Sequence, residues 1–368
     1  MEPYGAPQLD VPVAINVNEN PFAPSADLVA AIAARVAEAA TTLNRYPDRD
    51  FSQLRKGLSD YLAGESGVRV PADNIWAANG SNEVMLHIFS AFGGPGRTAL
   101  SFEPTYSMYH EYARTTFTRW LTRPRADDFS IDLEDALQTI AAEQPSIILL
   151  TSPNNPTGTY LPASTTEEIA RAAGEVPGGC IVVIDEAYIE FRRAETPSAL
   201  ELLSKFPHLV VSRTMSKAFG LAGARLGYLA GDRSVIDALK LVRLPYHLSA
   251  VTQATALAAL EHTSQLQEQV AHLRAERDAL VSWLSQRAYR GQPLRVADSD
   301  SNFIWFGKFE NRAELWQNLL DRGVLIRQTG PDGWLRVSVG TAAENEAFRT
   351  ALTEVLAQDN VKRKREDG

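Results

Sequence analysis

The sequence predicts an α/β fold with two units: a parallel sheet covered by helices, and a smaller α+β unit after it. Its 368 residues exceed the size at which one hydrophobic core usually stops growing, which favours two packed units. From about residue 75 to residue 229, short apolar and β-branched runs alternate with helical stretches. These runs are apolar on both faces, which is typical of strands buried between helices in a parallel sheet.

The N-terminal part of the chain predicts an arm followed by two helices. Residues 1–25 are rich in proline, asparagine and other polar residues, which favours an extended arm. Ser25 is a suitable N-cap for a helix over 26–40. A second helix is expected over 51–62, because apolar residues recur there at helical spacing.

Strand-like runs dominate the middle of the chain, and a different pattern follows residue 248. The runs lie at 98–102, 147–151, 181–184, 209–212 and 226–230. One long helix is expected over 251–287, since its leucines and valines can form a single apolar stripe. The smaller unit is completed by strands at 302–306 and 334–339 and by helices near 312–321 and 344–356.

These elements divide the chain into four expected parts. Residues 1–41, the arm and its helix, are expected to join the smaller unit, and residues 42–250 to form the larger one. Residues 251–357 then form the smaller unit together with the long connecting helix. Residues 358–368, which contain the basic cluster KRKR, are expected to be a disordered tail.

Composition and charge exclude several classes of protein. The chain has 36 Lys and Arg against 45 Asp and Glu, a formal net charge of −9, which argues against a nucleic-acid partner. Its single cysteine, Cys180, cannot form an intrachain disulfide, and the six histidines lack metal-ligand spacing, so no metal site is expected. No segment approaches the roughly 20 apolar residues of a membrane span, and no signal peptide is recognisable. We therefore expect a cytoplasmic protein without a membrane partner.

Four polar motifs lie where the predicted sheet should bind a ligand. The strings SPNNPTG (152–158), DEAY (185–188) and Ser216-Lys217 follow predicted strands, and NGSNE (79–83) opens a helical run. In open α/β sheets, ligands bind at the carboxyl ends of the strands. The joint occurrence of the motifs at one sheet edge therefore predicts a single binding site.

The chemistry of these residues together describes pyridoxal 5'-phosphate. Backbone N–H groups at the helix start in 79–83 suit a phosphate, and Arg225 adds a guanidinium for its oxygens. A buried Lys217 can lose its proton and form an imine with an aldehyde. The carboxylate of Asp185, at a strand end, can keep a heteroaromatic nitrogen protonated. An aldehyde, a phosphate and a pyridine nitrogen are the groups of this coenzyme.

The order and spacing of these motifs also carry a family resemblance. SPNNPTG, VVIDEAY and SRTMSKAFGLAGARLGY resemble the fold-type-I aminotransferases, which implies a large domain with a mostly parallel seven-stranded sheet and a smaller α+β domain. The strings NENPFAPS, LNRYPD, NGSNE, PTYSMY, LPYHLS, VLIRQ and LRVSVGT resemble the histidinol-phosphate aminotransferase branch. The resemblance runs from about residue 4 to residue 356.

The resemblance implies roles for individual residues around the coenzyme. Lys217, Asp185 and Tyr188 are implied as catalytic: Lys217 binds the aldehyde and moves the proton, and Asp185 pairs with the ring nitrogen. Asn155 and Tyr188 are implied to contact the phenolic oxygen, and Tyr106 to stack on the ring. The implied phosphate-binding residues are Gly80, Ser81, Asn82, Thr214, Ser216 and Arg225. Tyr46 resembles a tyrosine that reaches the neighbouring subunit's phosphate site, which implies a homodimer with shared active sites.

The same resemblance implies a phosphorylated substrate. Arg336, with Arg327, is implied to bind the substrate's anionic group, and a bidentate guanidinium accepts either a carboxylate or a phosphate. Residues implied to contact the substrate phosphate are Tyr4, Asn82, Tyr106 and Tyr246. The expected reaction converts histidinol phosphate and 2-oxoglutarate to imidazole-acetol phosphate and L-glutamate, a step of histidine biosynthesis.

Three other functions on the same scaffold stay open at this point. An aromatic amino-acid (phenylalanine) aminotransferase would have an apolar pocket in place of phosphate recognition. A threonine-phosphate decarboxylase would share the fold and a phosphorylated substrate. A non-catalytic regulator that binds the coenzyme would need an additional DNA-binding module.

Overall fold

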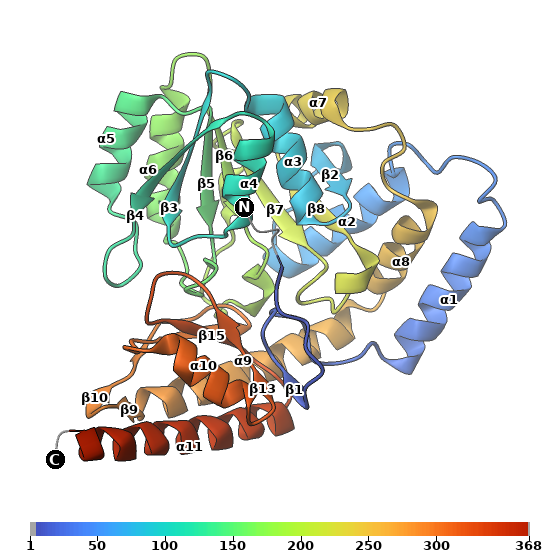
Figure 1. Ribbon diagram of the computed structural model, residues 1–368. Coiled ribbons are helices and arrows are strands. Elements are labelled where there is room, and N and C mark those ends of the chain that lie inside the picture. The colour runs from blue at the N-terminus through green and yellow to red at the C-terminus, as the bar shows by residue number, and fades with distance from the viewer. Residues whose placement is uncertain (1–4, 367–368) are drawn as a thin grey trace.

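A seven-stranded sheet forms the centre of the larger part of the molecule (Figure 1). The computed structural model describes residues 5–366, and side chains as far as residue 359. In spatial order the strands are β2 (Ile75–Ala78), β8 (Gly227–Ala230), β7 (Leu209–Thr214), β6 (Ile181–Asp185), β5 (Ile147–Thr151), β3 (Thr98–Glu103) and β4 (Arg119–Pro124). Strand β8 runs antiparallel to both of its neighbours, and the remaining pairs are parallel. The predicted α/β class with a mostly parallel seven-stranded sheet is confirmed.

All five strands predicted for this sheet are present, and two more were missed. Strands β5, β6 and β7 are buried along their whole length, which is why their sequences are continuously apolar. The missed strand β4 lies at the edge of the sheet and is only partly buried, so it lacks such a run. The missed strand β2 is four residues long and half alanine, which is a weak strand signal.

Helices and short connections surround this sheet, and their apolar faces form one large core with it. The α-helices are α2 (Ser52–Ser66), α3 (Ser81–Phe92), α4 (Met108–Thr115), α5 (Leu133–Glu143), α6 (Ala163–Gly174), α7 (Arg233–Val242) and α8 (Ala250–Leu260). Short 3₁₀ helices lie in the connections: η1 (Ala72–Asn74), η2 (Ile189–Phe191), η3 (Ala199–Leu202) and η4 (Ala222–Ala224).

A second core forms around a smaller, antiparallel sheet. Its strands, in spatial order, are β11 (Arg295–Val296), β12 (Phe303–Gly307), β15 (Leu335–Ser338) and β14 (Arg327–Gln328). Helices α10 (Arg312–Leu320) and α11 (Ala342–Glu366) accompany it, and the hairpin of β9 (Ala288–Tyr289) and β10 (Gln292–Pro293) lies beside it. Helix α9 (Thr263–Ser285) connects the two cores, since Leu266 and Leu273 belong to the first and Leu280 and Leu284 to the second.

The N-terminal arm and the helix after it pack against different cores. Strand β1 (Val13–Ala14) pairs with β13 (Val324–Leu325), and Ile15 belongs to the second core. Helix α1 (Ala26–Ala40), which was expected to join the same unit, instead packs on α8, and its Leu28 and Ile32 contact the first core. Figure 1 shows α1 at the edge of the larger part, away from the small sheet.

Two predictions about the C-terminal half are wrong. The single helix expected over 251–287 is broken between α8 and α9, where the N–H groups of Glu261 and His262 bond three residues back and the His262 ring donates to the Ala258 carbonyl at 2.8 Å. The tail expected to be disordered from residue 358 is helical as far as Glu366, since it continues α11 with residues that favour helix. Within residues 5–366, none of the helices has both the length and the apolar character needed to cross a bilayer.

Candidate active site

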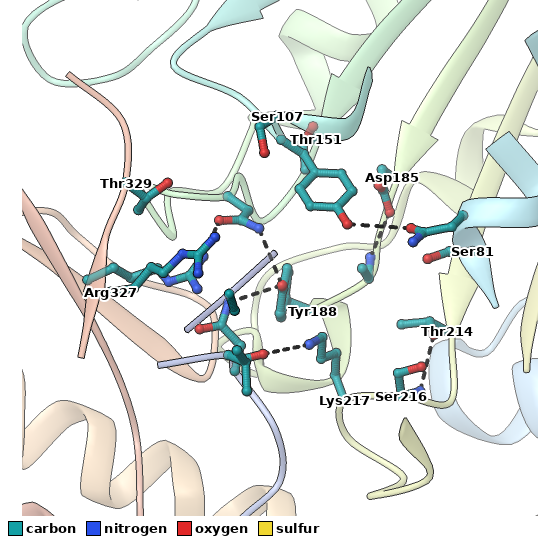
Figure 2. Close-up of a pocket in the computed structure, with 18 of the residues that line it drawn as sticks. Ser81, Ser107, Thr151, Asp185, Tyr188, Thr214, Ser216, Lys217, Arg327 and Thr329 are labelled. Atoms are coloured by element: carbon teal, nitrogen blue, oxygen red, sulfur yellow. Dashed lines mark hydrogen bonds between the residues drawn. The ribbon is translucent and has the colours of Figure 1, made fainter. Parts of the chain in front are cut away.

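A pocket lies at the carboxyl ends of β5, β6 and β7, between the two sheets and the N-terminal arm (Figure 2). The larger part supplies most of its wall, the arm supplies Asn16, Val17 and Asn18, and the smaller sheet supplies Arg327 and Arg336. Twelve predicted site residues line it: Ser81, Asn82, Tyr106, Asn155, Asp185, Tyr188, Thr214, Ser216, Lys217, Arg225, Arg327 and Arg336. Residues that are distant in the sequence therefore meet at the sheet edge where the motifs predicted a ligand.

Asp185 is the last residue of β6, and its carboxylate is buried at 5% exposure. The Tyr109 hydroxyl donates a hydrogen bond to Oδ2 at 2.7 Å, and the Ala187 N–H donates to Oδ1 at 3.2 Å. Burial raises the pKa of Asp185 to about 6, although both hydrogen bonds act in the opposite direction. A cation placed beside this carboxylate would favour its charged form, so the position suits a protonated ring nitrogen.

Lys217 lies shortly after β7, and its amine faces the same pocket as Asp185 (Figure 2). The Nζ atom donates a hydrogen bond to the Val17 carbonyl at 2.9 Å and lies 5.8 Å from the centre of the Tyr188 ring. Burial, and then the positive charge of Arg336, lower the pKa of Lys217 to about 8. A useful fraction of this amine is therefore neutral near pH 7, as a nucleophile or a base requires.

The start of helix α3 and the end of β7 form a corner suited to an anion. Gly80 has a φ of 85°, and a Cβ at this position would lie 2.6 Å from Nη2 of Arg225. Only glycine therefore allows the guanidinium to lie against the turn that opens the helix. Nη1 of Arg225 donates to the Ser216 hydroxyl at 3.4 Å, and the Ser216 N–H donates to Thr214 Oγ1 at 3.1 Å. The helix N-terminus, the guanidinium and the hydroxyls together can hold a phosphate.

A chain of hydrogen bonds joins the remaining pocket residues. Nη1 of Arg336 donates to Asn155 Oδ1 at 2.6 Å, and Asn155 Nδ2 donates to the Tyr188 hydroxyl at 3.5 Å. Asn18 of the arm also donates to that hydroxyl, at 3.1 Å. The Tyr106 hydroxyl donates to Asn82 Oδ1 at 3.4 Å on the other side of the pocket. Arg336, Asn155 and Tyr188 are thus held as one unit.

Of the predicted residues that the structure describes, Gly80, Tyr46 and Tyr246 do not line this pocket in the single chain, and Gly80 lies beside it against Arg225. Tyr46 and Tyr246 stack on each other, with ring centres 4.4 Å apart, and they are 79% and 39% exposed. Tyr4 lies outside the described residues. Sequence reasoning also missed two partners of the key groups, Tyr109 and Val17. Tyr109 belongs to the motif PTYSMY, but Tyr106 precedes helix α4, so no local spacing marks Tyr109, and only a tertiary contact brings it to Asp185.

The residues present fit the coenzyme that the sequence predicted. The amine of Lys217, the acid of Asp185 and the anion-binding corner face one cavity, as its aldehyde, ring nitrogen and phosphate require. Within residues 5–366, no group of three or more His, Cys, Asp or Glu side chains is arranged to hold a metal ion.

Comparison with known proteins identifies the family. The model of the aminotransferase class I and II family matches residues 12–352, and the chain belongs to this family. Two of its similar relatives carry the name of a narrower group, the histidinol-phosphate aminotransferases. The histidinol-phosphate aminotransferase of Bifidobacterium longum is 58% identical over 363 residues, covering 96% of this chain and 94% of that protein. That of Thermobifida fusca is 57% identical over 350 residues, covering 95% and 92%.

Solved structures show the same architecture. The histidinol-phosphate aminotransferase of Sinorhizobium meliloti, in complex with pyridoxal 5'-phosphate, has a TM-score of 0.81 and 26% identity, covering 95% of this chain and 91% of that one. The aspartate aminotransferase of Thermus thermophilus with maleate has a TM-score of 0.77 and 23% identity, covering 94% and 92%, which is a likeness of fold alone.

Proposed function

We propose that the protein is a pyridoxal-phosphate-dependent aminotransferase that interconverts histidinol phosphate and 2-oxoglutarate with imidazole-acetol phosphate and L-glutamate. The observation that carries this proposal is one pocket in which Lys217, Asp185 and the anion-binding corner at Gly80 and Arg225 face one another. Relatives more than half identical over nearly the whole chain, named histidinol-phosphate aminotransferases, support the substrate.

The pocket residues divide the chemistry between them. When bound, the coenzyme supplies an aldehyde that condenses with amines and a cationic ring that withdraws electrons from the substrate Cα. Asp185 holds a proton on the ring nitrogen, since its buried carboxylate gains most from a neighbouring cation. Lys217 would hold the aldehyde end of the coenzyme, and its amine, with its pKa lowered to about 8, could accept and return a proton at the substrate Cα.

The hydrogen-bonded unit of Arg336, Asn155 and Tyr188 links the substrate to the coenzyme. Asn155 and Tyr188 are placed to donate to the phenolic oxygen, beside the Lys217 amine. Arg336 presents its guanidinium to the pocket while Asn155 and the Asn16 carbonyl fix its orientation. A fixed guanidinium can bind the carboxylate of glutamate or the phosphate of an ester in turn, with Arg327 as a second cation on the same wall.

We propose further that two chains form a homodimer with shared sites. Large apolar side chains are exposed on α1, the segment after it, the end of α7, the segment between α7 and α8, and the start of α8: Val29, Leu43, Tyr46, Leu241, Leu244, Tyr246 and Val251. A soluble protein rarely leaves so many exposed together without a partner surface. In the dimer, Tyr46 would reach the phosphate corner of the partner, and Tyr246 its substrate. The single, buried cysteine is in keeping with work in the cytoplasm.

Side-by-side kinetics test the substrate. We expect kcat/KM for histidinol phosphate to exceed that for phenylalanine at least about 100-fold, with 2-oxoglutarate as the acceptor, because a site built for a phosphate leaves its cations unpaired with an apolar substrate. A preference for phenylalanine would favour the aromatic aminotransferase instead. Release of carbon dioxide from threonine phosphate, without formation of glutamate, would favour the decarboxylase.

A further inference from the structure

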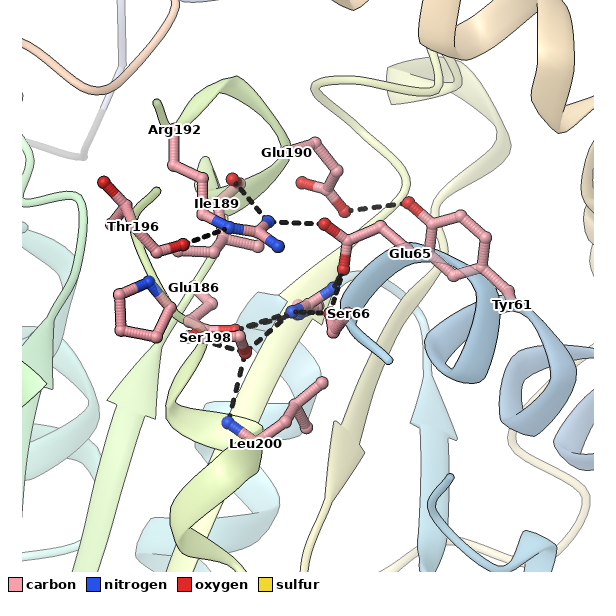
Figure 3. A network of polar contacts seen from close by, with 12 residues as sticks. Tyr61, Glu65, Ser66, Glu186, Ile189, Glu190, Arg192, Thr196, Ser198 and Leu200 are labelled. Carbon is pink, nitrogen blue, oxygen red and sulfur yellow. Dashed lines mark hydrogen bonds and ion pairs between the residues drawn. The ribbon is translucent and has the colours of Figure 1, made fainter. Parts of the chain in front are cut away.

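A buried ionic network lies directly behind the pocket, around the ends of strands β6 and β7 (Figure 3). We call it the Glu186–Arg213 network; its other members are Glu65, Ser66, Arg192 and Ser198. Glu186 directly follows Asp185, and Arg213 directly precedes Thr214. Side chains alternate between the two faces of a strand, so the network lies on the face opposite the coenzyme groups.

Arg213 is the centre of this network and is completely buried. Its Nε donates to Glu186 Oε2 at 3.0 Å, and its Nη1 donates to Glu65 Oε2 at 2.7 Å. Its Nη2 donates to the hydroxyls of Ser198 and Ser66 at 3.0 and 3.1 Å. The guanidinium therefore ties β7 both to the segment after β6 and to helix α2.

Glu186 ties down the loop that carries Tyr188. Its Oε1 accepts from the Ala199 N–H at 2.7 Å, and its Oε2 accepts from the Ser198 hydroxyl at 2.8 Å. The carboxylate of the residue that precedes the loop 187–198 thus holds the far end of that loop. Arg192 holds its middle, because Nε donates to the Thr196 carbonyl at 2.9 Å and Nη1 pairs with Glu65.

Stability alone is a weak reason for such a network. Buried ion pairs are often no more stabilising than apolar residues of the same volume, since both charges lose their hydration. The network instead fixes the orientation of the groups that it joins, because a planar guanidinium with several fixed acceptors permits little movement. Burial acts to raise the pKa of Glu65, but Arg213 and Arg192 lower it to about 2, so this carboxylate stays charged well below neutral pH.

The network lies where it can fix the separation between the ends of β6 and β7. Strands β6 and β7 are parallel neighbours with Asp185 opposite Ser212, and the Glu186 N–H donates to the Ser212 carbonyl at 2.8 Å. Asp185 serves the ring nitrogen and Thr214 the phosphate, which are opposite ends of one rigid coenzyme. A small shift between the strand ends would leave one of the two contacts unmade.

We propose that Glu186 and Arg213 are positioning residues whose ion pair fixes the separation between the Asp185 carboxylate and the phosphate corner at Thr214 and Ser216, so that one coenzyme molecule makes both contacts. This inference rests on the proposed function, since it takes the roles of Asp185 and Thr214 from there.

The test compares two ligands, pyridoxal 5'-phosphate and pyridoxal, which lacks the phosphate. In the wild type the phosphate adds its full binding energy, because ring and phosphate are held at the correct separation. Glu186→Gln keeps the size of the side chain but removes its charge. We expect it to reduce the ratio of the dissociation constants of pyridoxal and pyridoxal 5'-phosphate about 10-fold, the loss typical of one misplaced charged hydrogen bond. The pH midpoint of the change in absorbance of the bound coenzyme should also differ from that of the wild type.

Arg192→Lys is the matched control, because Arg192 belongs to the same network but touches neither β6 nor β7. It should lower the melting temperature while the ligand ratio stays within about twofold of wild type. If Glu186→Gln also changed only the melting temperature, the network would be structural and the proposal wrong. Should Glu186→Gln not fold, Ser198→Ala, which removes the hydroxyl between Glu186 and Arg213, should reduce the ratio in the same direction by a smaller factor. An unchanged ratio there would also overturn the proposal.

Asp185→Asn distinguishes failure of the positioning role of Glu186 and Arg213 from failure of the proposed function. If Asp185→Asn abolishes turnover while Glu186→Gln leaves the ligand ratio unchanged, the positioning role fails and the aminotransferase mechanism stands. If Asp185→Asn retains normal turnover, the role of Asp185 itself is wrong.

Discussion

Asp185 and Glu186 are adjacent in the chain and both buried, but their surroundings differ. Glu186 pairs with Arg213 and accepts from Ser198 and Ala199, so its charge is balanced where it lies. Asp185 has only neutral donors, Tyr109 and Ala187, and burial raises its pKa to about 6. Burial thus has two outcomes: with a counter-charge it produces a rigid anchor, and without one it produces a group ready to hold a cation.

The same contrast separates the two cations at the end of β7. Arg213 is surrounded by acceptors and serves as a fixed cross-link. Lys217 faces Arg336 and Arg225, and burial and these charges lower its pKa to about 8. Each prediction below tests one side of this contrast.

The largest effect should come from Lys217→Ala. Within the described residues Lys217 is the one lysine that lines the pocket, so its removal should reduce turnover by at least about 10⁴-fold. Borohydride should fix the coenzyme to the wild-type protein and not to the variant. The control is Lys205→Ala, since Lys205 is an exposed lysine paired with Glu167. Substantial transamination by the Lys217 variant would remove the central role assigned to this amine.

Asp185→Asn should leave the coenzyme bound but lower kcat. Asparagine keeps the shape of the side chain but cannot hold the ring nitrogen protonated, so a loss of about 10²–10³-fold is expected. Spectroscopic occupancy measured with kcat separates this from loss of the coenzyme. Asp128→Asn, in an exposed turn, should behave as wild type. A near-normal kcat in the Asp185 variant would contradict its role.

Removing a carboxylate charge should change the stability of the coenzyme-free protein in opposite directions in the pocket and in the Glu186–Arg213 network. The pKa of Asp185 is raised to about 6, so its charge destabilises the folded state as pH rises through that value. Asp185→Asn should therefore stabilise the protein at pH 8 by up to about 3 kcal/mol, and by little at pH 4.

Glu65 belongs to the network and should show the reverse. Its pKa is lowered to about 2, so its charge stabilises the folded state above pH 4.5 or so, and this stabilisation is lost as pH falls toward 2. Glu65→Gln should destabilise the protein at pH 8 by about 3 kcal/mol, because it leaves Arg213 with one counter-charge fewer. Urea unfolding of both variants at pH 4 and pH 8 tests the pair, and equal signs at pH 8 would contradict the contrast.

The sequence predicted the pocket residues much better than it predicted the Glu186–Arg213 network. Asp185, Lys217 and Asn155 were found because each follows a strand that a local apolar run identifies. The network was not found, because Glu65 and Arg213 are 148 residues apart and each alone resembles a surface charge. Tyr109 and the Val17 carbonyl were missed for the same reason, since tertiary contacts bring them to Asp185 and Lys217. The break between α8 and α9 leaves the apolar periodicity unchanged, so the periodicity does not predict it.

The smallest effect is expected from Tyr46→Phe. This variant tests a further difference, since the network is built from one chain whereas we expect the pocket to be completed by a second chain. Tyr46→Phe should raise the dissociation constant of the coenzyme about 10-fold, the value of one hydrogen bond to a phosphate. Tyr289→Phe, in the second core, is the control. Because Tyr46 would serve the partner's site, a dimer mixed from Tyr46→Phe and Lys217→Ala chains has one site with both lesions and one with neither. The intact site should bind the coenzyme with wild-type affinity and turn over, whereas a tyrosine acting within its own chain would leave each site with one lesion and no wild-type site.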